Sequence, residues 1–154
     1  MPVDTGVYRM TVTQSSADTL GRLRHAPARE RSVLVADDSL TVLRLIDRTL
    51  REAGYRVLLA EDGRQAVTCA LAEQPDLVVL DINMPELDGY GVCHELFSNS
   101  NWDSNTPVIF LTCSDAPHLT VLGEELGAFL SKPTEPELLL ETVAMLIDRK
   151  VTAQ

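Results

Sequence analysis

Residues 77–89 read LVVLDINMPELDG, so that an apolar run leads directly into an acid, Asp81, and then into a loop rich in Pro, Asp and Gly. Three other apolar runs end in the same way: VLVA before Asp37 and Asp38, VIFL before Thr112, and AFLS before Lys132. Short apolar runs bounded by turn residues predict buried strands. Because the carboxyl ends of parallel strands lie along one edge of an open sheet, we expect these polar side chains to converge.

Segments of helical period alternate with these runs. Ser39 is placed to cap a first helix and Gly54 to end it. Pro136 suits the first turn of the last helix. We expect strands at 32–36, 55–60, 77–81, 108–112 and 128–131, and helices at 39–53, 62–73, 89–97, 116–126 and 136–149. Five strand–helix units with strands that are apolar throughout predict an α/β fold, in which helices cover both faces of a parallel sheet.

The 154 residues suffice for one domain with a single core, at 45% hydrophobic content. The net charge of −10 is unevenly distributed. Residues 1–31 hold five Arg against three acids, which leaves eight basic residues against twenty acidic ones in the remainder. We interpret residues 1–31 as a flexible basic arm, 32–150 as the folded domain and 151–154 as a tail. So acidic a domain disfavours direct nucleic-acid binding, which depends on Lys and Arg.

The cysteines, Cys69, Cys93 and Cys113, are odd in number and lack the spacing of a metal site. They are expected to be small core residues in a reducing cytoplasm. No apolar run approaches the roughly 18 residues that a membrane span needs. We therefore expect a cytoplasmic protein without membrane association.

Three carboxylates at one sheet edge, those of Asp37, Asp38 and Asp81, repel one another unless a cation neutralises them. Oxygen ligands without His or Cys favour Mg²⁺, with Mn²⁺ as an alternative. Such an ion is usually completed by a phosphate oxygen, which indicates phosphoryl chemistry. Asp81 is the natural nucleophile, because a carboxylate is already ionised near neutral pH. The Lys132 ammonium and the Thr112 hydroxyl can both bind phosphoryl oxygens.

The aspartate pair, the DINMPELDG segment, Thr112 and Lys132-Pro133 occur in an order that resembles the receiver domain of two-component response regulators. The resemblance extends over residues 32–150. It implies a flavodoxin-like, doubly wound (βα)5 sandwich around a five-stranded parallel sheet. It also implies a single-domain, chemotaxis-regulator-like signalling switch, whose only catalysis is its own phosphorylation and dephosphorylation.

The resemblance assigns roles to individual residues. Asp81 would accept a phosphoryl group from a histidine kinase or phosphotransfer protein. Asp38 and Asp81 would ligate Mg²⁺ together with the Asn83 carbonyl, and Asp37 would act through a bound water. Lys132 would pair first with the acceptor carboxylate and then with the phosphoryl group.

Signal output would depend on Thr112 and Phe129, the implied switch pair. The face made by the fourth helix, fifth strand and fifth helix would then change its affinity for a downstream target protein, in a monomer or a phosphorylation-dependent dimer. The Lys132-Pro133 bond is often cis in this family. Two departures from the family pattern stand out: Cys113 occupies a position that is usually smaller, and the chain between Thr112 and Lys132 is about two residues short.

Three alternatives stay open. The chain could be a receiver fragment of a larger regulator rather than the single-domain regulator that we expect. A Mg²⁺-dependent phosphohydrolase of the haloacid-dehalogenase type also uses an Asp nucleophile, but it carries a second acid where Asn83 stands here. A receiver-like module that takes no phosphate is disfavoured by the complete set of site residues.

Overall fold

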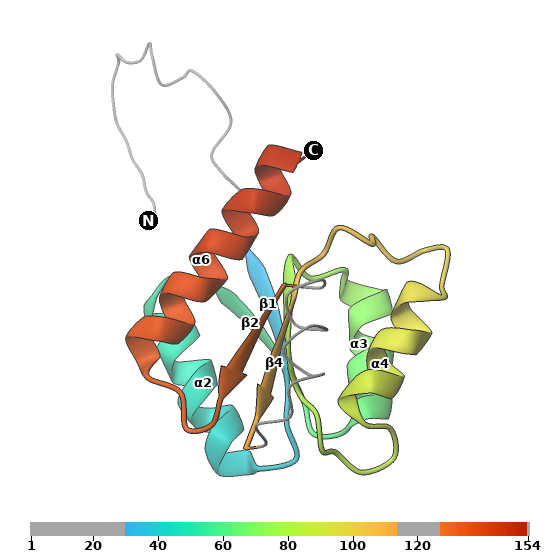
Figure 1. The fold of residues 1–154 in the computed structure, drawn as a ribbon, viewed down its shortest axis with the longest axis horizontal. Helices are drawn as coiled ribbons and strands as arrows, with labels where there is room; N and C mark the ends of the chain where they lie inside the picture. The colour runs from blue at the N-terminus through green and yellow to red at the C-terminus, as the bar shows by residue number, and fades with distance from the viewer. Residues whose placement is uncertain (1–29, 114–126, 154) are drawn as a thin grey trace, which may run out of the picture.

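The structure, a computed structural model, describes residues 30–113 and 127–153. A five-stranded parallel sheet with the strand order β2-β1-β3-β4-β5 forms its centre (Figure 1). The strands are β1 (Ser32–Ala36), β2 (Arg56–Ala60), β3 (Leu77–Asp81), β4 (Val108–Thr112) and β5 (Gly127–Ser131). The helices are α2 (Leu40–Glu52), α3 (Gly63–Glu73), α4 (Gly89–Phe97) and α6 (Pro136–Ala153).

Capping side chains begin three of the helices where the sequence predicts. Ser39 accepts a hydrogen bond from the Val42 amide, and Asp62 and Asp88 accept equivalent bonds at the starts of α3 and α4. The last helix continues to Ala153, so the prediction that it ends near residue 149 was wrong, and Val151 of the expected tail is helical. The predicted helix at 116–126 lies outside the described residues, as does the arm up to residue 29.

The core lies in two layers, because successive side chains of a strand point to opposite faces of the sheet. Leu34, Val78 and Phe110 pack on the face covered by α3 and α4. Their neighbours along the strands pack on the other face, under α2 and α6 (Figure 1). The flavodoxin-like arrangement with helices on both faces is thereby confirmed for the described elements.

Burial differs between central and edge strands. Every residue of β1, β3 and β4 is buried, as expected. The edge strands β2 and β5 are only partly buried, so the expectation of fully buried strands was wrong for them. An edge strand lacks a neighbour on one side, and Leu59 of β2 is 43% exposed as a result.

The three cysteines are free thiols. Cys93 is buried, and desolvation raises the pKa of its thiol to about 12. Cys69 is partly buried, but Cys113 is exposed, so it is not the core residue that was expected. Within residues 30–113 and 127–153, no helix combines the length and the apolar character that crossing a membrane requires.

Candidate functional site

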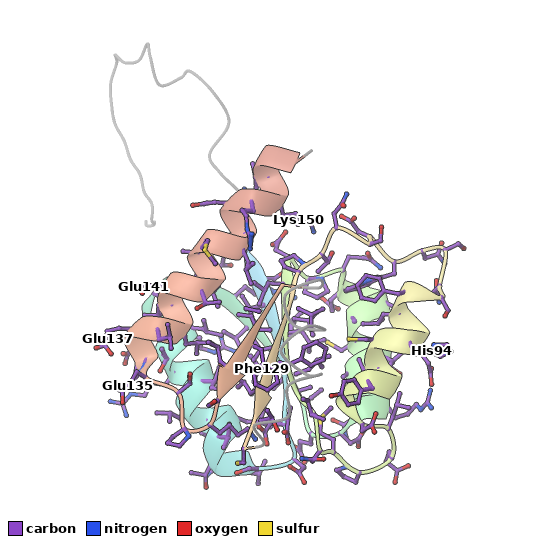
Figure 2. All side chains as sticks on the ribbon, viewed as in Figure 1. His94, Phe129, Glu135, Glu137, Glu141 and Lys150 are labelled. Carbon is purple, nitrogen blue, oxygen red and sulfur yellow. The ribbon has the colours of Figure 1, made fainter. Side chains whose placement is uncertain are left out.

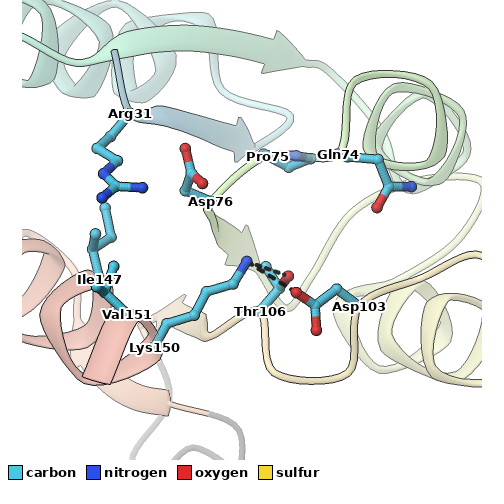
Figure 3. Close-up of a pocket in the computed structure, with 9 residues that line it drawn as sticks. All are labelled: Arg31, Gln74, Pro75, Asp76, Asp103, Thr106, Ile147, Lys150 and Val151. Carbon is cyan, nitrogen blue, oxygen red and sulfur yellow. Dashed lines mark hydrogen bonds and ion pairs between the residues drawn. The ribbon is translucent and has the colours of Figure 1, made fainter. Parts of the chain in front are cut away.

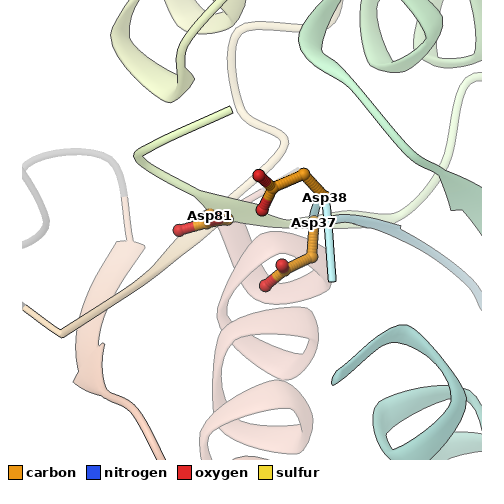
Figure 4. A group of neighbouring side chains, drawn as sticks. All are labelled: Asp37, Asp38 and Asp81. Carbon is orange, nitrogen blue, oxygen red and sulfur yellow. The ribbon is translucent and has the colours of Figure 1, made fainter. Parts of the chain in front are cut away.

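The carboxyl ends of β1 and β3 bring three carboxylates together. Ala36 pairs with Leu80 in the sheet, so Asp37 and Asp38 leave β1 beside the end of β3, where Asp81 stands. One oxygen from each carboxylate lies within 4.8 Å of the others (Figure 4). Asp37 and Asp81 are buried and Asp38 is exposed. The convergence predicted from the sequence is therefore present.

Lys132 approaches this cluster from β5. Thr112 pairs with Ser131 in the sheet, and the Lys132 amide donates to the Thr112 carbonyl oxygen at 2.9 Å. This register directs the Lys132 ammonium between two carboxylates, 2.6 Å from Asp37 Oδ2 and 3.4 Å from Asp81 Oδ1. The shorter ion pair is with Asp37, which the sequence did not indicate.

The electrostatics of the site leave Asp81 short of positive charge. Burial raises the pKa of the Asp81 carboxyl, and the neighbouring Asp37 charge raises it further. The ammonium of Lys132 and the backbone amide of Asn83 act in the opposite direction without cancelling these effects. Burial lowers the pKa of Lys132, but its contacts with Asp37 and Asp81 outweigh that and raise it overall. The lysine is therefore charged, and one ammonium serves two buried acids.

This donor set suits a hard divalent cation. The three nearby side chains offer carboxylate oxygens, and such ligands favour Mg²⁺ or Mn²⁺. Burial and the Asp37 charge both raise the pKa of Asp81, and a further positive charge at the cluster would act against that repulsion. The Asn83 amide donates to Asp81 Oδ1 at 3.3 Å, so the backbone of the following loop lies against the cluster. The residues present therefore fit a metal ion.

The two implied switch residues lie at different places. Thr112 is 1% exposed and ends β4 at the same sheet edge as the carboxylates. Phe129 pairs with Phe110 in the sheet and packs against the core layer under α3 and α4 (Figure 2). The Lys132-Pro133 peptide is cis, as the resemblance implies. His94 is exposed on α4, away from this cluster in the sequence (Figure 2).

One contact within the site was not predicted from the sequence. Asp37 Oδ1 accepts a hydrogen bond from the Ser39 amide at 2.9 Å, while Asp37 Oδ2 meets Lys132. Asp37 thus holds the turn between β1 and α2 in addition to facing the cluster. A carboxylate two residues before a capping Ser is the pattern that could have indicated this turn.

Sequence comparison defines the class of protein to which this fold and site belong. The family model described as the response regulator receiver domain matches residues 33–144. The chain belongs to this family, whose members are phosphoacceptor switches of two-component signalling.

Individual relatives agree with this assignment. The chain is 39% identical over 122 residues to a probable transcriptional regulator, ycf27, of Cyanophora paradoxa, covering 78% of this chain and 49% of the relative. It is 36% identical over 125 residues to the alkaline phosphatase synthesis transcriptional regulatory protein PhoP of Bacillus subtilis, covering 80% and 51%. The chain thus spans about half the length of the curated relatives it matches.

Solved structures of similar length also match. The chemotaxis protein CheY4 of Vibrio cholerae superimposes with a TM-score of 0.69 at 32% identity, covering 77% of this chain and 99% of CheY4. The receiver domain of the Francisella response regulator 1452 gives a TM-score of 0.70 at 31% identity, covering 78% and 98%. The fold and the receiver family are therefore supported by both sequence and structure.

Proposed function

We propose that Asp81 is the phosphoacceptor of this receiver and that it takes a phosphoryl group from a phosphohistidine donor in a Mg²⁺-dependent reaction. The observation that carries the proposal is the position of the Asp81 carboxylate, which lies 3.4 Å from the Lys132 ammonium and beside the carboxylates of Asp37 and Asp38. A nucleophile, a cation and a set of metal ligands thus share one sheet edge.

In the proposed step, a carboxylate oxygen of Asp81 forms a bond to phosphorus while the phosphorus–nitrogen bond of the donor breaks. The imidazole leaves with the electron pair, and Asp81 becomes an aspartyl phosphate. Bound Mg²⁺ would supply positive charge to the phosphoryl oxygens. Asp37, Asp38, Asp81 and the Asn83 carbonyl would hold that ion.

Lys132 and Thr112 would bind the transferred group. Once Asp81 carries the phosphoryl group as an acyl phosphate, its interaction with the Lys132 ammonium weakens, and the ammonium can bind a phosphoryl oxygen instead. The hydroxyl of Thr112 is a donor at the same edge. Movement of Thr112 towards the phosphoryl group, accompanied by rotation of Phe129, would alter β5 and α6. We propose that a downstream protein target reads this change.

The proposed partners are a histidine kinase or phosphotransfer protein as donor and a protein target as receiver of the signal, in the cytoplasm. The protein would act as a switch, and its only chemistry would be its own phosphorylation and dephosphorylation. A regulator of about twice this length, as in the curated relatives, would place the same switch beside a further domain.

Incubation with acetyl phosphate and Mg²⁺, followed by intact mass measurement, tests the assignment. We expect a mass gain of one phosphoryl group, which peptide mapping after borohydride reduction locates at Asp81. Asp81→Asn should show no gain. Asp38→Asn, which keeps the acceptor but removes a ligand, should slow the gain at least tenfold at low Mg²⁺. Phosphorylation that persists unchanged in Asp81→Asn would refute the proposal.

A further inference from the structure

The loop between β3 and α4 carries Asn83 and has a strained turn. Its two ends are close together, since the Gly89 amide donates to the Ile82 carbonyl oxygen at 2.9 Å. Within the loop, the Leu87 amide donates to the Pro85 carbonyl oxygen at 2.8 Å, and Glu86 between them has a φ of 72°. A hydrogen bond to the second residue before, around a positive φ, defines a strained γ-turn. A non-glycine residue keeps such a conformation only when its surroundings impose it.

Directly after this turn, Leu87 lies close to two glycines, Gly63 and Gly91. A Cβ atom added at Gly63, the first residue of α3, would lie 1.7 Å from the Leu87 carbonyl oxygen and 2.6 Å from its carbonyl carbon. A Cβ atom added at Gly91 in α4 would lie 2.4 Å from Leu87 Cδ1. The Leu87 backbone therefore rests against α3 and its side chain against α4. We call Gly63 and Gly91 the Leu87 seat.

We propose that the Leu87 seat is a positioning element for the metal site, with Gly63 as its principal residue. Both glycines lie outside the carboxylate cluster and offer it no side-chain ligand. They act through the loop, because the place of Leu87 fixes the path of the chain back to Asn83, whose amide already meets Asp81. This inference rests on the proposed function only in that the cluster binds a divalent cation.

An Ala at position 63 has to displace one of the two segments. Real Cβ contacts do not fall below 3.0 Å, so the separation from the Leu87 carbonyl oxygen has to grow by about 1.3 Å. The helix is the stiffer partner, because Ala66, Val67 and Ala70 of α3 are buried in the core. Asn83, Pro85 and Glu86 of the loop are exposed, whereas Met84 between them is buried in the core. We therefore expect the loop to move and the Asn83 carbonyl to move with it.

The effect should appear in metal affinity. Substitutions of groups that orient metal ligands typically weaken binding 10- to 100-fold. We expect Gly63→Ala to weaken Mn²⁺ binding about tenfold. Gly91→Ala should weaken it less, because the atom it meets is the end of a flexible side chain rather than the backbone.

The experiment titrates the full chain with Mn²⁺ and follows the free ion by electron paramagnetic resonance. Gly54→Ala is the matched control: Gly54 follows α2 with a φ of 98°, and an added Cβ meets nothing within 4 Å. Ala at that position strains the backbone and lowers the melting temperature but leaves the loop alone. We expect Gly54→Ala to bind Mn²⁺ like the wild type despite its lower stability.

Unchanged Mn²⁺ affinity in a folded Gly63→Ala protein would overturn the inference. If Gly63→Ala does not fold, Gly91→Ala decides: weaker binding supports the seat, and wild-type binding overturns it. Equal weakening in Gly54→Ala would also overturn it, since general destabilisation would then explain the loss. The proposed function fails separately. A wild type that binds Mn²⁺ but gains no phosphoryl group at Asp81 would refute that function and leave the seat intact.

Discussion

The strands begin along one edge of the sheet, the amino edge, and end along the other, the carboxyl edge. Each of these edges has a buried aspartate, and the surroundings of the two aspartates differ. At the amino edge, Asp76 is 3% exposed and accepts hydrogen bonds from the amide of Ser32 at 2.8 Å and from its hydroxyl at 3.4 Å. At the carboxyl edge, Asp81 is 5% exposed and faces Asp37, and its pKa is raised by burial and by that charge. The first carboxylate is bound by backbone and hydroxyl donors, whereas the second shares a single ammonium, that of Lys132, with Asp37.

The lysines at the two edges also differ in the groups that they contact. Lys150 of α6 lies 3.1 Å from the hydroxyl of Thr106 and 3.4 Å from Asp103 Oδ2, and all three residues line one pocket (Figure 3). Lys132 is shared by two buried acids. Similar residue types thus stabilise structure at one edge and form an acidic cluster that fits a cation at the other. The contrast supports the proposal that the carboxyl edge is the functional one, because perturbed ionisable groups cluster at functional sites.

Among the variants that test this comparison, Asp76→Ala should change the stability of the protein most. Removing the carboxylate leaves the buried Ser32 amide without this acceptor, which should lower the free energy of unfolding by about 2 to 3 kcal/mol. Urea denaturation followed by the fluorescence of Trp102, the single and buried Trp, measures it. Asp76→Asn keeps an acceptor oxygen and should lose less. If Asp76→Ala also weakened Mn²⁺ binding, the two edges would not be independent.

A divalent cation should stabilise the protein through the carboxyl edge. At a Mg²⁺ concentration ten times its dissociation constant, the free energy of unfolding should rise by about 1.4 kcal/mol, because the ion binds only the folded state. Denaturation in Mg²⁺ and in EDTA measures the difference. The rise should persist in Asp76→Asn and largely disappear in Asp81→Asn. Equal stabilisation of both variants would place the ion elsewhere.

The positions of the site residues could be predicted from the sequence, because an apolar run that ends in a polar residue is a local pattern. Which of these residues form ion pairs with one another could not be predicted from the sequence. Whether Lys132 lies closer to Asp37 or to Asp81 depends on the register between β4 and β5, which local sequence does not encode. The contact of Gly63 with Leu87 joins segments that pack only in the tertiary structure, although the helix at 62–73 that contains Gly63 was predicted.

Asp81→Asn should stabilise the metal-free protein by about 1 kcal/mol at neutral pH, since it removes a buried charge that faces Asp37 while Lys132 keeps its shorter ion pair. The sign follows from the raised pKa. Folded Asp81 holds its proton more tightly than the unfolded chain, so wild-type stability falls as the pH rises from the ordinary value of 3.8 through the folded pKa.

Denaturation of the wild type and Asp81→Asn across pH 3 to 7 in EDTA tests this. The advantage of the variant should be absent below about pH 4 and reach its full size above the folded pKa of Asp81. A variant that is less stable than the wild type at pH 7 would show that Asp81 is satisfied in the metal-free fold, like Asp76. The contrast between the two edges would then be lost.

The smallest effect is expected for Lys150→Met at the amino edge. Asp103 is 39% exposed, so its ion pair with Lys150 is screened by water and should contribute about 0.5 kcal/mol or less. The pKa of Asp103 is lowered mainly by the Asn105 amide and only secondarily by Lys150, so the carboxylate stays stabilised when the lysine is removed. Thermal denaturation in low and high salt should show a small loss that fades with added salt. A loss as large as that of Asp76→Ala would mean that the amino edge also depends on a buried charge pair.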